Sequence, residues 1–268
     1  MNRIDARFAE LKARGRIGLI PFVTAGDPRP DATVAIMRAL VDAGADLIEL
    51  GVPFSDPMAD GPVIQHASER ALANGVGLAR IFEWVGEFRR TDATTPVVLM
   101  GYLNPVEIHG PARFAQDAVA AGADGVLLVD CPVEELDAAA PLRAAGLHQI
   151  LLAAPTTTDA RLARVCEAAA GFLYYVSFAG ITGANRLSLD DVRARVERVK
   201  RDATTPIAVG FGVRDAASAA AIGAFADAVV VGSALVERLA GAADGADACV
   251  RARDFLAPIR AALDAPSP

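Results

Sequence analysis

The feature that most constrains the fold is a regular alternation of short apolar runs with Ala-rich helical stretches along the whole chain. The apolar runs are hydrophobic throughout rather than at every second residue, which is typical of parallel strands covered on their outer face. We predict eight strands, at 17–24, 46–52, 95–102, 124–130, 149–154, 171–177, 205–212 and 227–233. Helices are predicted at about 31–43, 62–73, 78–90, 111–121, 133–145, 159–169, 188–200, 214–223, 233–240 and 246–263.

Eight strand–helix units in 268 residues predict an α/β fold, a (β/α)8 TIM barrel that forms a single domain over residues 1–268. The amphipathic segment "MNRIDARFAELKARG" predicts an extra N-terminal helix. Extra helices are also predicted after the second and the eighth strand, because two helical stretches follow each of them. The main alternative is a doubly wound open sheet, but the dinucleotide fingerprint GxGxxG does not follow the first strand.

The charge of the chain limits its partners. A net charge of −7 and a pI near 5.0 argue against a nucleic-acid or anionic-membrane surface. No apolar stretch approaches the roughly 18 to 20 residues that a membrane span needs, and the N-terminal segment does not have the pattern of a signal peptide. The expected location is the cytoplasm.

A carboxylate interrupts the second apolar run, in the stretch "LIELGVPFSDPMADG" at 47–61. Glu49 lies near the end of the predicted strand, and in a TIM barrel the chemistry belongs at the C-terminal ends of the strands. It shares its parity with Leu47, so we expect its side chain inside the barrel. Burial without a cationic neighbour raises the pKa of a carboxyl group toward the range useful for acid/base catalysis. Glu49 is therefore predicted to be catalytic.

Two more carboxylates follow in the loop after this strand. Asp56 lies between Ser55 and Pro57, where a turn is at least as good an interpretation as a functional site. Asp60 directly precedes "GPVIQHASER", so its carboxylate either caps the following helix or contacts a substrate, and the spacing favours neither. By contrast Asp46, Asp124 and Asp227 open strands, which predicts positions at the opposite, stability-determining face.

Glycines after the last two strands indicate an anion site. The stretches "VGFGVRD" at 209–215 and "VVGSALVERL" at 230–239 let backbone N–H groups approach an anion, and "GSAL" opens a short helix. This is the usual phosphate-binding position of a TIM barrel. The sequence therefore predicts a phosphorylated small-molecule substrate held at Gly210, Gly212 and Gly232.

Several residue types are absent from the strand C-termini. The two lysines, Lys12 and Lys200, fall in predicted helices, which excludes a Schiff-base mechanism there. The three histidines share no ligand spacing and the three cysteines show no CxxC pattern, so neither a metal site nor a disulfide framework is predicted. What remains is acid/base catalysis by carboxylates, with Tyr174 or Tyr175, on a substrate that supplies its own electron sink.

The sequence resembles one family closely, the tryptophan synthase alpha chains. "IELGVPFSDPMADGPVIQ" is similar to the family's signature segment nearly residue for residue. The resemblance continues through "PFVTAGDP", "LMGYLNPV", "LLVDCPVEE", "YYVSFAGITG", "VGFGV" and "VVGSA", and so covers essentially the whole chain. It implies a lyase of L-tryptophan biosynthesis that cleaves indole-3-glycerol phosphate to indole and glyceraldehyde 3-phosphate by a retro-aldol reaction.

The resemblance also implies roles for single residues. Glu49 would be the general acid/base, Asp60 would hydrogen-bond the indole N–H, and Tyr174 rather than Tyr175 aligns with the active-site tyrosine. Phe22 and Leu127 would line the indole slot, whereas for Met100 we expect ordinary core packing.

The remaining binding residues follow from the same resemblance. The implied phosphate site comprises Gly183, Gly210, Phe211, Gly212, Gly232 and Ser233. The loop at 177–188 resembles the family's mobile lid, in which Thr182 would contact Asp60.

A partner is implied as well. Alpha chains of this family work with a beta chain that carries pyridoxal phosphate and receives indole, so an α2β2 heterotetramer is expected and no cofactor on this chain. We expect the beta chain to contact Asp56 and a turn at Asn104 and Pro105.

The sequence also leaves three alternative functions open. A free-standing lyase would release indole without a partner. A phosphosugar isomerase on the same barrel would ignore indole compounds. A non-catalytic binding barrel is disfavoured because Glu49, Asp60 and the glycines of the anion site are all present.

Overall fold

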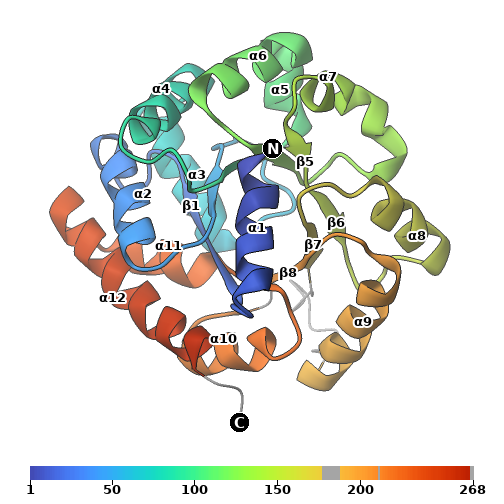
Figure 1. Cartoon of the computed structure of the whole chain (residues 1–268). Helices are drawn as coiled ribbons and strands as arrows, with labels where there is room; N and C mark the ends of the chain where they lie inside the picture. Colours follow the sequence, from blue (N-terminus) through green and yellow to red (C-terminus); the bar gives the residue numbers. More distant parts are fainter. Residues whose placement is uncertain (177–187, 211, 266–268) are drawn as a thin grey trace.

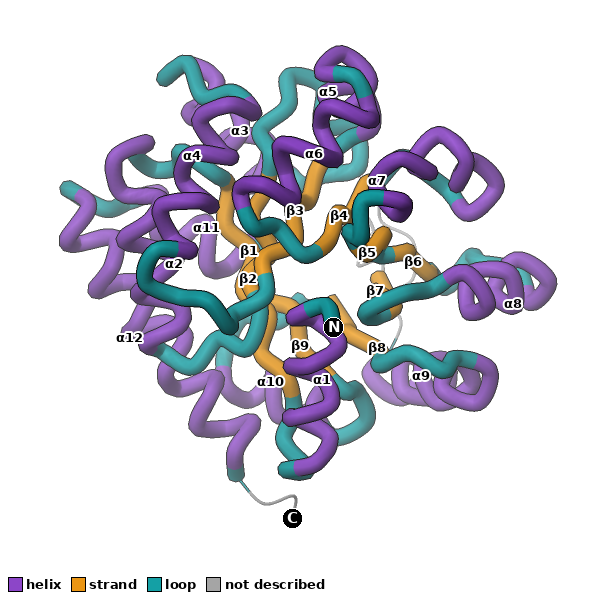
Figure 2. Tube along the Cα trace, turned by 45° about the horizontal axis from the view of Figure 1, so that its top comes forward, coloured by secondary structure: helices purple, strands orange, loops and turns teal. Residues whose placement is uncertain are grey.

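A parallel barrel of strands lies at the centre of the molecule and is ringed by helices (Figures 1 and 2). The computed structural model describes residues 1–176, 188–210 and 212–265. The strands are β1 (Gly18–Thr24), β2 (Ile48–Gly51), β3 (Val97–Gly101), β4 (Gly125–Leu128), β5 (His148–Gln149), β6 (Leu151–Ala153), β7 (Leu173–Val176), β8 (Ile207–Gly210) and β9 (Ala228–Val231). They pair in the order β5-β4-β3-β2-β1-β9-β8-β7-β6, which confirms the predicted TIM barrel.

The strand predicted at 149–154 is divided in two. Its first part, β5, pairs with β4, and its second part, β6, pairs with β7. Ile150 joins the two parts; it is buried, and its N–H donates to the carbonyl of Val126 at 2.9 Å. One extended segment thus serves both neighbours, and counting it as one strand gives the eight strands of the predicted fold.

The helices cover the outside of the barrel. They are α1 (Arg3–Ala13), α2 (Thr33–Asp42), α3 (Pro62–Ala73), α4 (Leu78–Arg89), α5 (Leu103–His109), α6 (Pro111–Ala121), α7 (Ala140–Ala144), α8 (Asp159–Ala168), α9 (Leu189–Asp202), α10 (Ala216–Gly223), α11 (Ser233–Ala240) and α12 (Gly245–Asp264), with 3-10 turns η1 (Pro30–Ala32) and η2 (Val133–Ala139). The predicted extra helices are confirmed: α1 precedes the barrel, α3 and α4 follow β2, and α11 and α12 follow β9. None of the described helices is long and apolar enough to span a membrane.

The prediction of a turn at Asn104 and Pro105 is wrong. Both residues lie in the first turn of α5, a helix that is absent from the sequence-based prediction. Proline is tolerated there because the first N–H groups of a helix have no acceptor within it. The start of α5 is fixed from outside, since the Leu103 N–H donates to the Asp130 carboxylate at 2.7 Å.

Two apolar layers are separated by the wall of the barrel. Ile48 and Leu50 of β2 belong to the outer core beneath the helices. Leu47 belongs to the inner core, which also contains Ile4 and Phe8 of α1. Helix α1 therefore fills one end of the barrel, and Figure 1 looks onto that end. The other end holds the C-termini of the strands.

Three aspartates join the strands at the end that α1 fills. Asp46, Asp124 and Asp227 accept the N–H groups of Leu19, Val97 and Ile207 at 2.8 to 2.9 Å. Each also forms ion pairs: Asp46 with Arg16 and Arg260, Asp124 with Arg3 and Arg89, and Asp227 with Lys200. These three aspartate clamps are at the face predicted for stability.

Candidate active site

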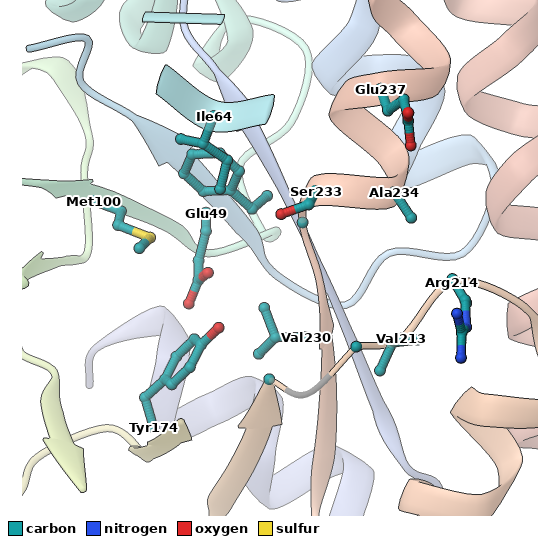
Figure 3. A pocket seen from close by; sticks show the side chains of 14 residues that line it. Glu49, Ile64, Met100, Tyr174, Val213, Arg214, Val230, Ser233, Ala234 and Glu237 are labelled. Carbon is teal, nitrogen blue, oxygen red and sulfur yellow. The ribbon is translucent and has the colours of Figure 1, made fainter. Parts of the chain in front are cut away.

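A cavity of about 570 Å³ opens at the C-terminal ends of the strands (Figure 3). Polar groups and apolar side chains share its wall, as in most small-molecule sites. The lining residues are Phe22, Glu49, Ile64, Met100, Tyr174, Gly210, Gly212, Val213, Arg214, Val230, Gly232, Ser233, Ala234 and Glu237.

Glu49 lies at the bottom of this cavity and is fully buried. Its side chain points into the barrel, as its parity with Leu47 predicts. Neither carboxylate oxygen has a hydrogen-bond partner among the described residues. Desolvation raises the pKa of Glu49 from 4.5 to about 8, so the group is protonated at neutral pH and poised to exchange a proton.

Tyr174 faces Glu49 across the cavity, and Figure 3 shows the hydroxyl and the carboxyl group pointing toward each other. Burial raises the pKa of Tyr174, and the nearby Glu49 and Asp60 raise it further. Tyr175 points the opposite way, into the outer core. A Cβ at Gly210 would collide with the Tyr174 hydroxyl, so Gly210 leaves space for this tyrosine.

Asp60 does not cap the helix that follows it. The N-cap of α3 is Gly61, and no side chain caps this helix. Instead the Asp60 carboxylate accepts a hydrogen bond from the Tyr102 hydroxyl at 3.0 Å. Burial raises the pKa of Asp60, and the bond from Tyr102 partly opposes that rise. Of the two interpretations that the spacing left open, the structure excludes capping.

An apolar surface connects the two carboxyl groups. Phe22, Ile64 and Met100 line the main cavity and also an adjoining cleft that contains Asp60. Met100 thus lines the site, and the expectation that it serves only in the core is wrong. Leu127 pairs with Met100 in the β3–β4 register but is fully buried in the inner core, beneath the lining residues.

The glycines of the predicted anion site converge on one wall. Gly232 is the N-cap residue of α11 and Ser233 is its first residue, so the first N–H groups of α11 lack acceptors within the helix. Gly212 lies beside them in the lining with a φ of +50°. Backbone N–H groups and the positive end of a helix dipole are suited to bind a phosphate. The predicted residues Thr182, Gly183 and Phe211 lie outside the described residues.

The structure adds lining residues that sequence reasoning missed. Tyr102 follows β3 directly, and an aromatic residue at a strand C-terminus was the available signal. Arg214 and Glu237 line the cavity near the anion site. Asp56 is exposed; its carboxylate accepts the Ser55 hydroxyl at 2.5 Å, and its carbonyl accepts the Met58 N–H at 2.8 Å.

Metal-ligating residues are dispersed over the part of the chain that the structure describes, where no group of three or more His, Cys, Asp or Glu side chains is placed to hold a metal ion. Cys131, Cys166 and Cys249 are buried free thiols.

Known proteins of one family match this chain over its length. Residues 8–262 match the family described as tryptophan synthase alpha chain. The tryptophan synthase alpha chain of Xylella fastidiosa (strain 9a5c) is 61% identical over 266 residues, which cover 99% of each protein. That of Xanthomonas oryzae pv. oryzae (strain PXO99A) is 62% identical and covers 98% of this chain and 99% of the relative.

The fold agrees with this similarity. The crystal structure of tryptophan synthase subunit alpha from Legionella pneumophila str. Paris has a TM-score of 0.92 to this structure, at 45% identity and with coverage of 98% of this chain and 99% of that one. The chain belongs to the tryptophan synthase alpha chain family.

Proposed function

We propose that the cavity above Glu49 is the site of the alpha reaction of tryptophan synthase, the cleavage of indole-3-glycerol phosphate to indole and glyceraldehyde 3-phosphate. Members of the family perform this reaction in tryptophan biosynthesis. The observation that carries the assignment is a fully buried, unpaired carboxyl group with a pKa of about 8, placed between an apolar surface and an anion site.

In this proposal Glu49 moves the protons. Its carboxyl group donates a proton to C3 of the indole ring, and the resulting carboxylate then accepts the proton of the glycerol hydroxyl. As that proton leaves, the carbonyl of glyceraldehyde 3-phosphate forms and the carbon–carbon bond breaks. The bonding electrons return to the indole ring, and Glu49 ends protonated as it began.

Asp60 supports the same reaction at the other side of the ring. Protonation at C3 places positive charge on the indole nitrogen, and a carboxylate that accepts the N–H hydrogen bond stabilises that charge. The apolar surface of Phe22 and Met100, with Leu127 behind it, fits the ring between the two carboxyl groups.

The phosphate is assigned to the backbone N–H groups at Gly212, Gly232 and Ser233. Tyr174 completes the wall beside Glu49. For Thr182, Gly183 and Phe211 the assignment rests on the family resemblance alone.

Alpha chains of this family work with a beta chain. We assign the docking surface to the C-terminal face of the barrel, and the expected assembly is an α2β2 heterotetramer in the cytoplasm. Two exposed apolar side chains support this surface: Met58 in the loop after β2 is 83% exposed, and Ile108 in α5 is 79% exposed. Both side chains belong to segments that directly follow a strand, the loop after β2 and the helix after β3, at the C-terminal end of the barrel.

The experiment is to incubate the purified chain with indole-3-glycerol phosphate and to measure indole. Glu49→Gln is expected to lower turnover by about 10²- to 10⁴-fold while substrate binding is retained, because it keeps the shape of the side chain and removes the proton exchange. Glu69→Gln on the exposed side of α3 is the matched control and should keep full turnover. Conversion of open-chain ribose phosphates without any indole would favour an isomerase instead.

A further inference from the structure

Tyr102 contacts both ends of the loop that contains Asp60. Its hydroxyl donates to the Asp60 carboxylate at 3.0 Å and accepts the Ala59 N–H at 3.0 Å. Its ring lies 5.1 Å from the ring of Phe54, at the start of the same loop. A single buried side chain therefore holds residues 54 and 59–60 in place.

Among the described residues, Tyr102 is the only hydrogen-bond donor to the Asp60 carboxylate. The other bonds of Asp60 use its backbone: its N–H donates to Pro57, and its carbonyl accepts from the side chain of Gln65. These bonds fix the chain but leave the direction of the carboxylate free. The carboxylate takes its direction from Tyr102.

Tyr102 is itself held by rigid parts of the barrel. It follows β3, and it is the N-cap residue of α5, whose first N–H is bound to Asp130. Burial raises the pKa of its hydroxyl, and the Asp60 carboxylate raises it further, so the group stays a donor over the pH range in which enzymes work.

We propose that Tyr102 is a positioning residue, which aims the Asp60 carboxylate at the indole nitrogen and holds the loop 53–60 in the geometry required for cleavage. This inference rests on the proposed function, because it assigns Tyr102 an effect through Asp60 on that reaction. Tyr102 exchanges no proton with the substrate.

The variant Tyr102→Phe keeps the ring against Phe54 and removes both hydrogen bonds. We expect kcat to fall roughly ten- to a hundredfold and KM to change by less than about threefold, because the lost bond orients the Asp60 carboxylate toward a positive charge that forms on the indole nitrogen only during the reaction. The hydrogen bond favours the ionised form of Asp60, so its loss raises the pKa of that carboxyl group. The acid limb of the kcat–pH profile should therefore move to higher pH, while the basic limb set by Glu49 stays in place.

Two further variants make the test specific. Tyr175→Phe removes a hydroxyl from the outer core and should leave both limbs unchanged. Phe54→Leu loosens the start of the loop and keeps the bond to Asp60, so it should speed hydrogen exchange at 54–56 without moving the acid limb.

The assay uses the full chain with indole-3-glycerol phosphate, and circular dichroism confirms that each variant is folded. If the wild-type chain cleaves the substrate and Tyr102→Phe retains both its kcat and its acid limb, the positioning role is refuted and the proposed function stands. An equal shift of the acid limb in Phe54→Leu would also refute it. If the wild-type chain forms no indole, the proposed function itself fails.

Discussion

At the scale of single residues, the burial that makes Glu49 reactive also weakens the fold. The folded chain keeps the Glu49 proton up to a pKa of about 8, whereas the unfolded chain loses it near 4.5. Between these values unfolding releases a proton, so stability falls as the pH rises through this window. A reactive buried carboxyl group is thus maintained at the expense of stability.

This leads to a prediction about stability. Glu49→Gln cannot ionise, so its free energy of unfolding should exceed that of the wild-type chain, by an amount that grows from pH 5 to pH 8 and reaches the order of a few kcal/mol. Urea denaturation of both proteins at several pH values measures the difference. A difference that is constant with pH would show that Glu49 ionises freely in the folded chain.

The glycines of the site give a second prediction. A Cβ at Gly210 would collide with Tyr174, whereas at Gly232 its nearest contact would be 3.6 Å from Phe22, an ordinary distance. Gly210→Ala should therefore displace Tyr174 and lower kcat by at least about tenfold, as expected when a catalytic wall is misplaced. Gly232→Ala should keep the tyrosine in place and change mainly KM. Steady-state kinetics separates the two effects, and equal losses of kcat would contradict the structural distinction.

Single residues differ in how well the sequence predicts them. Glu49 was predictable because strand parity and an apolar setting fix both its direction and its environment. The position of Tyr102 at a strand C-terminus could be read from the sequence, but its bond to Asp60 could not, because that bond joins residues 42 positions apart that meet only in the folded barrel. Met100 and Leu127 are paired in register, and which of them lines the cavity depends on side-chain depth, which no sequence pattern encodes.

At the scale of elements, the three aspartate clamps have one design. Each aspartate precedes a strand, donates its own N–H to the neighbouring strand and accepts an N–H from it through its carboxylate. Arginine pairs with the buried carboxylates of Asp46 and Asp124, and lysine pairs with the half-exposed carboxylate of Asp227. The clamps fix the relative height of adjacent strands at the end of the barrel remote from the cavity.

Removing one clamp should therefore affect stability and spare catalysis. Asp124→Asn leaves the guanidinium of Arg89, which is 10% exposed, without its anion. We expect a loss of about 3 kcal/mol in the free energy of unfolding, typical of a broken buried ion pair, with kcat of the folded protein unchanged. Glu83→Gln breaks an exposed pair with Arg80 and should cost less than about 1 kcal/mol. Urea midpoints and kcat of both variants check this, and a large fall in kcat of folded Asp124→Asn would contradict it.

The elements themselves were largely predictable, because apolar runs and helical stretches alternate in unbroken order. The exceptions have local causes. Helix α5 is short and has a proline as its third residue, so its sequence fits a loop as well as a helix. The division between β5 and β6 depends on the closure of the barrel, which involves partners far away in the sequence.

At the scale of the whole molecule, the exposed Met58 and Ile108 lie on elements that meet at Tyr102, which bonds to the loop after β2 and begins α5. Docking of the beta chain on this face would bury both side chains and restrain the loop 53–60. We therefore predict that the beta chain raises the rate of indole formation and slows hydrogen exchange in 53–60. Steady-state cleavage with and without the cognate beta chain is the measurement.

The matched control for that experiment is Ile108→Asp, which places a charge on the proposed docking surface and leaves the cavity intact. It should weaken stimulation by the beta chain without altering the rate of the isolated chain. Equal rates with and without the partner would move the free-standing lyase to first place.

Helix α1 closes one end of the barrel, and this limits the route by which molecules can enter and leave the cavity. Ile4 and Phe8 occupy the end of the barrel that α1 covers, whereas the cavity lined by Glu49 opens at the strand C-terminal face. Substrate and both products would then pass through the same opening of the cavity, on the face where the partner is proposed to bind. A partner that docks over this opening would therefore lie where the products leave the cavity.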